Sequence, residues 1–396
     1  MRKGLLRFLG QVFEMEMSRL KIELNTRQEE WQTEFREFSN KEIAPYAGKH
    51  DIEEKLDMEV VRKIAEKGYL GSMLPKQYGG MELDTVSIGI LNEEIGRGCS
   101  SARALLTVHG MVSLAIHRWG TVEQKEYYLP RMASGKMIGA FALTEPNVGS
   151  DAKSIETTAV FSGDEYILNG HKKWITMSQL ADVFLIFARC DDKPTAFLVE
   201  RNTPGFSVVP MSGLMGCRAS MIGELYLENC RIPKSSIIGT VGSGLTHVAL
   251  YALDYGRYTV ACGSVGLSQA CLEQSIRYSR KRKQFNAPLR ENQLIQKMIT
   301  EMVVNIKASR LMCYNAGYLK DAKDPDCLME TWNAKYFTSK VANLSANYAV
   351  QIHGANGYCR EYPVERLYRD AKSGEIIEGT SQMHEVLIAT NAFRHF

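Results

Sequence analysis

The sequence predicts an α+β protein of several domains, in the order helical N-terminal domain, central β-barrel or β-sandwich, and C-terminal four-helix bundle. Hydrophobic residues follow a helical period in the first third of the chain, alternate in short strands in the middle, and return to long helices at the end. The 396 residues, 45% of them hydrophobic and 23% charged, suffice for two or three domains with a large buried core. We expect an N-terminal extension over residues 1–22 and domains over residues 23–140, 141–244 and 245–396.

The first ten residues combine positive charge with apolar residues, as the front of a targeting peptide does. Arg7, Glu14 and Glu16 interrupt the apolar character, and no small-residue cleavage site follows. We therefore expect an extension of a cytoplasmic protein, or an upstream start codon with Met15 or Met17 as the alternative start. No later stretch approaches the roughly 20 apolar residues of a membrane span, so none is expected.

Residues 20–139 show a mainly helical pattern. Ile88, Leu91 and Ile95 recur at steps of three and four residues, which predicts one buried helix face. Pro75 and the glycine pair that follows it predict a loop between helices.

The hydrophobic period changes to that of strands after residue 139. Residues 157–161 and 165–168 predict two strands joined by a tight turn at residues 162–164. The Asn169-Gly170 pair predicts another hairpin turn, because both residues tolerate positive φ. Further strands are expected before the domain ends near residues 242–244, at residues 183–187, 196–199 and 206–209.

A wide apolar face marks one long helix in the C-terminal part of the chain and suits a helical bundle. We interpret this face as core packing. It consists of Leu294, Ile295, Met298, Ile299, Met302, Val303 and Ile306.

Charge and cysteine usage exclude several classes of function. The formal net charge of +3 is small for this length, so no general affinity for nucleic acid follows. The nine cysteines form no Cys-x-x-Cys pair and no His/Cys cluster at metal-ligand spacing, so we expect neither a metal site nor structural disulfides. Scattered cysteines of this kind are typical of a reducing, cytoplasmic compartment.

Three short segments carry the strongest functional information. Glu378 stands among apolar and small residues, where desolvation raises the pKa of a carboxyl into the range of a general base. The plain alternative is a solvated surface glutamate. The other segments are Phe141–Asp151, which contains Thr-Glu-Pro, and Lys173–Thr176, which reads Lys-Trp-Ile-Thr. In their order along the chain, Phe141–Asp151, Lys173–Thr176 and the segment of Glu378 resemble the acyl-CoA dehydrogenase family.

The resemblance covers nearly all of the chain after about residue 22 and implies that an acyl thioester is oxidised with FAD. In the family a glutamate takes the Cα proton and flavin N5 takes the Cβ hydride, which implies Glu378 as the base. The thioester carbonyl is then stabilised by the Glu378 backbone N–H and by a ribityl hydroxyl of the flavin. Asp254 and Arg257 are implied near the pantetheine arm of the substrate; the alternative is an ordinary intrahelical ion pair.

The resemblance also implies two groups of FAD-binding residues. One group surrounds the isoalloxazine ring, with its serine near the flavin phosphate or the pantetheine arm, where the plain alternative is a strand end with a turn. The other group binds the diphosphate and adenosine, partly on FAD held by a neighbouring subunit, which implies a homodimer or homotetramer. A solvated helix end is the alternative there. The first group is Phe141, Leu143, Thr144, Ser150, Trp174 and Thr176; the second is Arg282, Gln284, Phe285, Gln293, Gln351, Gly354, Thr380 and Gln382.

Three positions depart from the family pattern. Asn286 stands where the family usually has glycine after the aromatic residue, and Ala355 replaces a glycine of a common pair. Asn tolerates left-handed conformations and Ala is small, so neither change excludes FAD. Ile377 stands where many members have tyrosine, which alters the packing over the acyl chain.

Four further segments most resemble one subgroup, the acyl-carrier-protein dehydrogenases of polyketide pathways that make hydroxymalonyl- or methoxymalonyl-type extender units. This resemblance implies a short polar acyl group on a carrier protein, with the basic run Arg280–Lys283 as a docking site for an acidic carrier. Alternatives are a short-chain acyl-CoA dehydrogenase of catabolism, an oxidase or monooxygenase that uses O2, and a non-catalytic binding scaffold. The electron acceptor of a dehydrogenase would be an electron-transfer flavoprotein or O2. The four segments are Lys172–Thr176, Phe187–Asp191, Gly216–Met221 and Gly256–Gly263.

Overall fold

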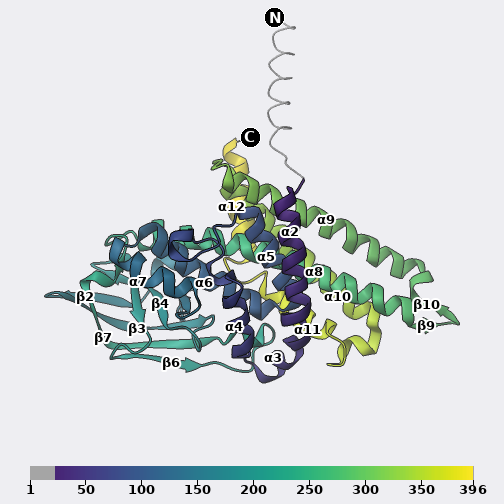
Figure 1. The fold of residues 1–396 in the computed structure, drawn as a ribbon, viewed down its shortest axis with the longest axis horizontal. Helices are drawn as coiled ribbons and strands as arrows, with labels where there is room; N and C mark the ends of the chain where they lie inside the picture. Colours follow the sequence, from purple (N-terminus) through teal and green to yellow (C-terminus); the bar gives the residue numbers. More distant parts are fainter. Residues whose placement is uncertain (1–22, 396) are drawn as a thin grey trace, which may run out of the picture.

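A computed structural model describes residues 23–395 of the chain, so the expectation for the N-terminal extension lies outside the described residues. The order of elements is helical, β and helical, as the sequence predicts. Figure 1 shows the β-domain at one end of the molecule and a small hairpin, β9–β10, at the other, with the helices between them. None of the helices in this part of the chain has the length and apolar character needed to cross a membrane.

Four of the N-terminal helices, α2, α4, α5 and α7, begin at polar capping residues. Asn25 and Thr121 each form a capping box with the glutamine three residues on, and Asp84 accepts from the Ser87 N–H. The loop predicted at Pro75 is confirmed, and Gly80 is required there because a Cβ would lie 1.9 Å from the Leu74 carbonyl oxygen. The helices are α2 (Thr26–Phe38), α3 (Ala47–Glu53), α4 (Met58–Glu66), α5 (Thr85–Gly98), α6 (Ser100–Trp119) and α7 (Val122–Ala133).

The middle of the chain forms one eight-stranded mixed sheet in the order β6-β7-β3-β2-β4-β5-β8, with β1 paired in parallel to β4. The sheet folds over on itself. The Phe184 ring of β4 contacts the Phe206 ring of β6, at 4.8 Å between centroids, although the two strands are not neighbours in the sheet. Tyr166 of β3 and Phe197 of β5 meet in the same way at 5.1 Å. The strands are β1 (Gly139–Ala142), β2 (Thr158–Ser162), β3 (Glu165–Ile175), β4 (Val183–Cys190), β5 (Lys193–Glu200), β6 (Phe206–Pro210), β7 (Gly223–Pro233) and β8 (Ile237–Ile238).

The hairpin predicted at Asn169-Gly170 is wrong, because β3 runs through both residues. The register against β7 shifts between Leu168 and Gly170, which marks a β-bulge. Asn169 Oδ1 accepts from the Asn229 N–H at 2.7 Å, and a Cβ at Gly170 would lie 2.4 Å from Thr157 Oγ1. The pair therefore serves a close approach between strands instead of a turn.

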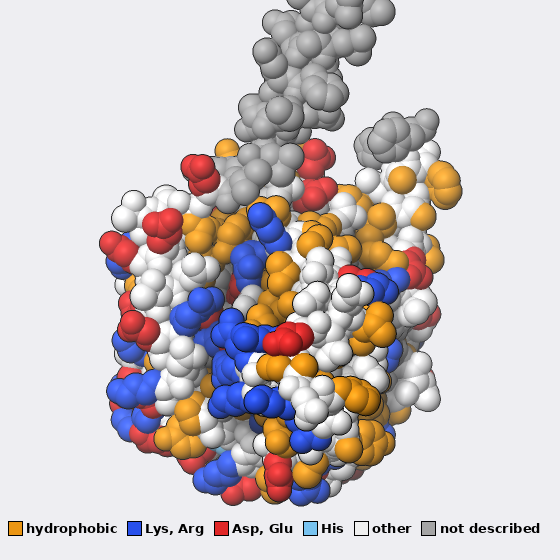
Figure 2. Space-filling view, turned by 90° about the vertical axis from the view of Figure 1, so that its right-hand side faces the viewer, with side chains coloured by type: hydrophobic (Ala, Val, Ile, Leu, Met, Phe, Trp, Pro, Cys, Tyr) orange, Lys and Arg blue, Asp and Glu red, His pale blue; other side chains and the backbone are white. Residues whose placement is uncertain are grey.

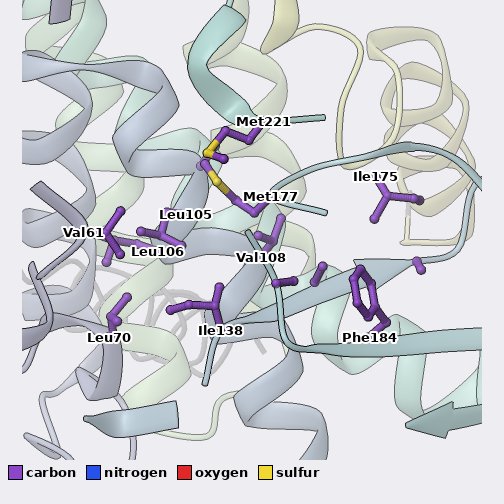
Figure 3. Close-up of a cluster of buried hydrophobic side chains, with 14 of the residues drawn as sticks. Val61, Leu70, Leu105, Leu106, Val108, Ile138, Ile175, Met177, Phe184 and Met221 are labelled. Atoms are coloured by element: carbon purple, nitrogen blue, oxygen red, sulfur yellow. The ribbon is translucent and has the colours of Figure 1, made fainter. Parts of the chain in front are cut away.

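One hydrophobic cluster joins the β-domain to the N-terminal helices. Figure 3 shows Val108 of α6 and Ile138 between Leu105 on one side and Phe184 on the other, with Met177 and Met221 pointing toward each other. This shared core fixes the β-domain against α6, and so fixes both relative to the bundle that α6 also contacts.

The C-terminal helices pack around α8, which also contacts α5 and α6. On α9, Met302 and Ile306 are buried as predicted, but Leu294 and Val303 are 73% and 46% exposed. The interpretation of the whole apolar face as core is therefore wrong, because the face is wider than the part of α9 that the other helices of the chain bury. The elements are α8 (Leu250–Lys281), β9 (Lys283–Gln284), β10 (Ala287–Pro288), α9 (Gln293–Asp321), α10 (Cys327–His353), α11 (Val364–Ser373) and α12 (Ser381–His395). All nine cysteines are free, as expected.

Candidate active site

Glu378 lies in the turn between α11 and α12, with its carboxylate directly over α8. Its φ of 56° is left-handed, and Gly379 follows with a φ of 93°. A Cβ at Gly256 of α8 would lie 2.4 Å from Glu378 Oε2, so only glycine leaves room for the carboxylate there. A strained turn and a glycine on the facing helix together set the direction of this side chain.

A half-buried arginine and a buried lysine hold the backbone of this turn. Arg257 Nε donates to the Glu378 carbonyl oxygen at 3.0 Å, and Lys335 Nζ donates to the Gly379 carbonyl oxygen at 2.6 Å. The Glu378 N–H has no acceptor among the described residues, although a turn of this kind would normally satisfy it. The turn therefore presents a free N–H next to its own carboxylate.

The environment of Glu378 favours the neutral form of its carboxyl more than water does. The residue as a whole is half-buried, but its Oε2 is enclosed and has no hydrogen-bond partner among the described residues. Burial raises the pKa of Glu378 to about 7, although the charges of Arg257, Lys335 and Arg103 oppose the rise. A carboxyl group with this pKa and with one oxygen that has no hydrogen-bond partner is suited to act as a general base.

Asp254 and Arg257 do not form the intrahelical ion pair that was the alternative for them. Asp254 instead pairs with Lys320 of α9, and Arg257 contacts the turn of Glu378. The guanidinium of Arg257 also lies 5.6 Å from the centre of the Trp332 ring. Of the two residues, only Arg257 contacts the turn that carries Glu378.

The residues predicted for the isoalloxazine ring gather at the ends of β1 and β3. The Lys173 N–H donates to the Thr144 carbonyl oxygen at 2.9 Å, which ties the two segments together. Trp174 has a φ of 63° and is 50% exposed. The hydroxyls of Thr144 and Thr176 are half-buried and form no hydrogen bond within residues 23–395. The exposed ring of Trp174 offers a flat apolar face beside the unpaired hydroxyls of Thr144 and Thr176. This combination fits the isoalloxazine ring of FAD, which has a polar edge. Phe141 and Leu143 lie on the same segment, and Ser150 is exposed in the loop that follows.

A buried ion pair beneath these residues was not predicted. Lys172 Nζ lies 2.6 Å from Glu145 Oε1, and both side chains are almost fully enclosed. The same carboxylate accepts from the N–H and hydroxyl of Thr157, while Lys172 also donates to the Leu143 carbonyl oxygen at 3.2 Å. The pair therefore braces both segments of the predicted ring site. Alternation in β3 could have revealed it, because it places Lys172 on the inward face.

The residues predicted for the diphosphate and adenosine fall into two places. Arg282, Gln284 and Phe285 stand at or next to the hairpin β9–β10, at the opposite end of the molecule from the β-domain (Figure 1). Phe285 and Asn286 have φ of 52° and 63°, the left-handed pair of a two-residue hairpin, so asparagine suits the position. Gln293, Gln351 and Gly354 lie at the nearby helix ends, whereas Thr380 and Gln382 follow Glu378 at the start of α12.

The end of the molecule with β9–β10 is rich in exposed basic side chains. Figure 2 shows a band of Lys and Arg side chains on this face, bordered by hydrophobic ones. Residues Arg280 to Lys283 are all exposed and form no ion pair with the described part of the chain. A cavity of about 270 Å³ lies beside them, lined by Arg280, Arg290 and Ile299 among others. This cavity does not border Glu378.

Fold and site define an FAD-dependent oxidoreductase that acts on acyl thioesters. Profiles of the acyl-CoA dehydrogenase N-terminal, middle and C-terminal domains match residues 25–136, 140–230 and 242–393. The chain belongs to the acyl-CoA dehydrogenase family. Like other members of that family, it is a flavoprotein that uses FAD.

Individual relatives cover most of the chain. The acryloyl-CoA reductase (NADH) of Anaerotignum propionicum is 38% identical over 98% of this chain and 100% of its own length. The short-chain specific acyl-CoA dehydrogenase of Clostridium acetobutylicum is 37% identical over 91% and 96%. The structure of a glutaryl-CoA dehydrogenase in complex with glutaryl-CoA has a TM-score of 0.90 at 36% identity, over 94% and 96%.

Two similar solved structures are of proteins whose names refer to a carrier protein or to a polyketide. The prolyl acyl carrier protein oxidase AnaB has a TM-score of 0.89 at 32% identity, covering 93% of this chain and 100% of its own. FkbI, described for biosynthesis of the methoxymalonyl extender unit of a polyketide, has a TM-score of 0.83 at 28% identity, over 92% and 99%.

Proposed function

We propose that this chain dehydrogenates a short acyl thioester with Glu378 as the base that takes the Cα proton. The observation that carries this proposal is the enclosed, unpartnered Oε2 of a carboxyl whose pKa burial raises to about 7. FAD, when bound, supplies the acceptor for the Cβ hydride, which no amino acid side chain can provide. The free Glu378 N–H donates to the thioester carbonyl as that oxygen gains enolate character.

The remaining residues position these groups. Arg257 and Lys335 hold the turn of Glu378 by its carbonyl oxygens, so the carboxylate and N–H keep a fixed relation. Ring binding is assigned to Phe141, Leu143, Thr144, Trp174 and Thr176, with Ser150 near phosphate or pantetheine. The diphosphate and adenosine are assigned to Arg282, Gln284, Phe285, Gln293, Gln351, Gly354, Thr380 and Gln382.

The FAD site is proposed to be completed by a second copy of the chain. The hairpin with Arg282 and Phe285 stands far from the β-domain of its own chain (Figure 1), so one chain does not bring the two groups of predicted FAD residues together. The exposed apolar residues of α9, among them Leu294 and Val303, supply a surface for the copy. A homodimer or homotetramer follows.

Replacing both Leu294 and Val303 with glutamate should convert the associated protein to monomers that retain little FAD, because charges on α9 disfavour the contact. Sedimentation and the flavin absorbance of the separated species measure this. Val160→Glu is the matched control, since Val160 is 59% exposed on the β-domain. A wild-type monomer that keeps its full complement of FAD would contradict the assembly.

A carrier-protein thioester is proposed as the substrate, in preference to a CoA thioester. Support comes from the four segments typical of carrier-protein dehydrogenases, from the likeness to AnaB and FkbI, and from the exposed run Arg280–Lys283, which suits an acidic carrier. The specific proposal is extender-unit supply in a polyketide pathway. The alternative is a catabolic short-chain acyl-CoA dehydrogenase, favoured by relatives such as that of Clostridium acetobutylicum.

The two substrate classes are separated by anaerobic bleaching of the flavin absorbance with one acyl group presented on CoA and on a carrier protein. We expect faster bleaching by the carrier-protein thioester, and slower bleaching by it alone in a Lys281→Glu, Lys283→Glu variant. Lys297→Glu on α9 is the control charge change. Faster bleaching by the CoA thioester would refute the carrier assignment. In air, stoichiometric hydrogen peroxide would indicate an oxidase, and its absence an acceptor such as an electron-transfer flavoprotein.

A further inference from the structure

Three consecutive carbonyl groups, those of residues 378–380, each accept a hydrogen bond from a side chain on a different helix. Arg257 of α8 donates to the first carbonyl, and Lys335 of α10 donates to the second. The third carbonyl oxygen lies 3.0 Å from Nδ1 of His384, which belongs to α12. Because a carbonyl oxygen can only accept, the ring of His384 carries a proton on Nδ1 and donates it to this bond.

The ring of His384 is enclosed against the backbone of the turn. The residue is 2% exposed, and its Cε1 would lie 3.2 Å from a Cβ at Gly379. On its other side the ring meets the indole of Trp332 nearly edge-on, at 6.4 Å between centroids. The imidazole is therefore held between α10 and the segment that follows Glu378.

The two nitrogens of this ring have different surroundings. Nδ1 is used by the turn, whereas Nε2 of His384 is sealed and has no hydrogen-bond partner within residues 23–395. A buried nitrogen without a partner lowers stability, and an aliphatic side chain would fill the same space without that cost. The Nδ1 contact is therefore what a histidine adds at this position beyond packing.

The ring supplies a donor without supplying a charge. Burial lowers the pKa of His384 to about 4, and the nearby cations add to the fall, although the Nδ1 hydrogen bond opposes it. Three cations already face the carboxyl of Glu378 and oppose the rise of its pKa. They are Arg257 of α8, Lys335 of α10 and Arg103 of α6. A neutral imidazole holds the turn without a fourth charge that would lower the pKa of Glu378 further.

We propose that His384 is a positioning residue for the base, because its neutral ring fixes the Thr380 carbonyl and thereby the turn that directs the Glu378 carboxylate. Without this bond the segment is held at two carbonyl groups instead of three, and water gains access to the carboxyl. His384 acts through the turn and does not contact the reacting atoms. This role rests on the proposed acyl thioester oxidation with Glu378 as the base.

The first test asks which nitrogen of the ring is needed. Asparagine places its amide near the position of Nδ1, and glutamine places its amide near that of Nε2. We expect His384→Gln and His384→Leu to slow anaerobic flavin bleaching by a butyryl thioester on the order of 10-fold, with rates normalised to bound FAD. His384→Asn should retain most of the wild-type rate. If His384→Leu does not fold, the comparison of the two amide variants still decides.

The pH dependence separates positioning from a general loss of stability. In His384→Gln and His384→Leu the rise of the bleaching rate should move below about pH 7, since water that reaches Glu378 reduces the desolvation that raises its pKa. His384→Asn should keep the wild-type midpoint. His353→Leu is the matched control, because the buried ring of His353 forms the same kind of bond, from Nδ1 to the Ala349 carbonyl at 2.7 Å, at the far end of α10. It should lower the melting temperature without moving the midpoint.

Hydrogen exchange over residues 375–384 examines the turn without turnover. The Ser381 N–H donates to the Glu375 carbonyl at 2.9 Å, so its exchange reports opening of the turn. Exchange should be several-fold faster in His384→Gln and His384→Leu than in wild type and His384→Asn.

Equal effects of His384→Asn and His384→Gln on rate, midpoint and exchange would overturn the positioning role. Exchange as slow as that of wild type in His384→Gln and His384→Leu would overturn it as well. An active Glu378→Gln variant would instead end the proposed role of Glu378, while faster exchange in His384→Gln alone of the two amide variants would still show that His384 holds the turn.

Discussion

Glu378→Gln should bind FAD as the wild type does and lose acyl thioester oxidation by about 10²- to 10⁴-fold, the usual contribution of a general base. Glutamine preserves the size of the side chain in the space above Gly256, so the turn held by Arg257 and Lys335 should persist. The amide cannot accept the Cα proton. Flavin absorbance of the purified variant and anaerobic bleaching by substrate measure the two parts of this result.

The pH dependence provides an independent check on the same carboxyl. The pKa of Glu378 is raised to about 7, and the base must be deprotonated to act, so the rate of flavin bleaching should rise with pH through about 7 and then level off. The residual rate of Glu378→Gln should lack this rise. Glu375→Gln is the matched control, because that carboxylate lies in the same turn but pairs with Lys372 at 2.7 Å. An active Glu378→Gln variant would exclude Glu378 as the base.

The order of domains was predictable because each part has its own hydrophobic period over many residues. Ile88, Leu91 and Ile95 are buried in α5 as their spacing indicates, and the predicted turn after β2 is present at Gly163. Single dipeptides are weaker guides. Asn169-Gly170 has the conformational freedom of a hairpin turn. Thr157, which directly precedes β2, and Asn229 of β7 approach the pair instead, and the strand forms a bulge there.

The sequence groups candidate site residues that lie in one continuous segment, but it does not connect residues from distant elements that meet in the fold. Glu378, Thr380 and Gln382 are neighbours in sequence, so the segment itself brings them together. Lys335 and Arg103 reach the site from α10 and α6, and no local pattern connects them to Glu378. One sign was available for Arg103, because it is the only Lys, Arg, Asp or Glu between Arg97 and Arg118. A lone charge within a buried helix indicates a partner elsewhere.

The exposed part of α9 shows the same limit in another form. The apolar spacing predicts that Leu294 and Val303 are covered, but it does not indicate whether their own chain or a second copy covers them. The predicted FAD residues are divided between the two ends of one chain. A complete FAD site would therefore require a second copy, which favours the second copy as the cover for α9. Assembly and cofactor binding are therefore expected to be lost together.

Lys172→Met should cause the largest loss of stability among the substitutions considered, about 3–5 kcal/mol, because it leaves Glu145 as an unpaired charge in the interior. Lys172 and Glu145 are 0% and 2% exposed, and their contact at 2.6 Å joins the segment of Thr144 to that of Trp174. The melting temperature should fall by several degrees, and FAD should dissociate more readily because both segments of the proposed ring site lose their brace. Thermal unfolding and flavin retention during gel filtration measure the two effects.

The double variant Glu145→Gln, Lys172→Met separates the ionic pair from mere packing. It removes both charges while the Thr157 N–H and hydroxyl still find an acceptor in the glutamine, so much of the lost stability should return. Lys173→Met is the neighbouring control; its partly exposed pair with Glu224 should contribute about 1 kcal/mol or less. If Lys172→Met and Lys173→Met have equal effects, the buried pair does not brace the site. If the double variant regains stability but still loses FAD, the charges themselves position the two segments for the cofactor.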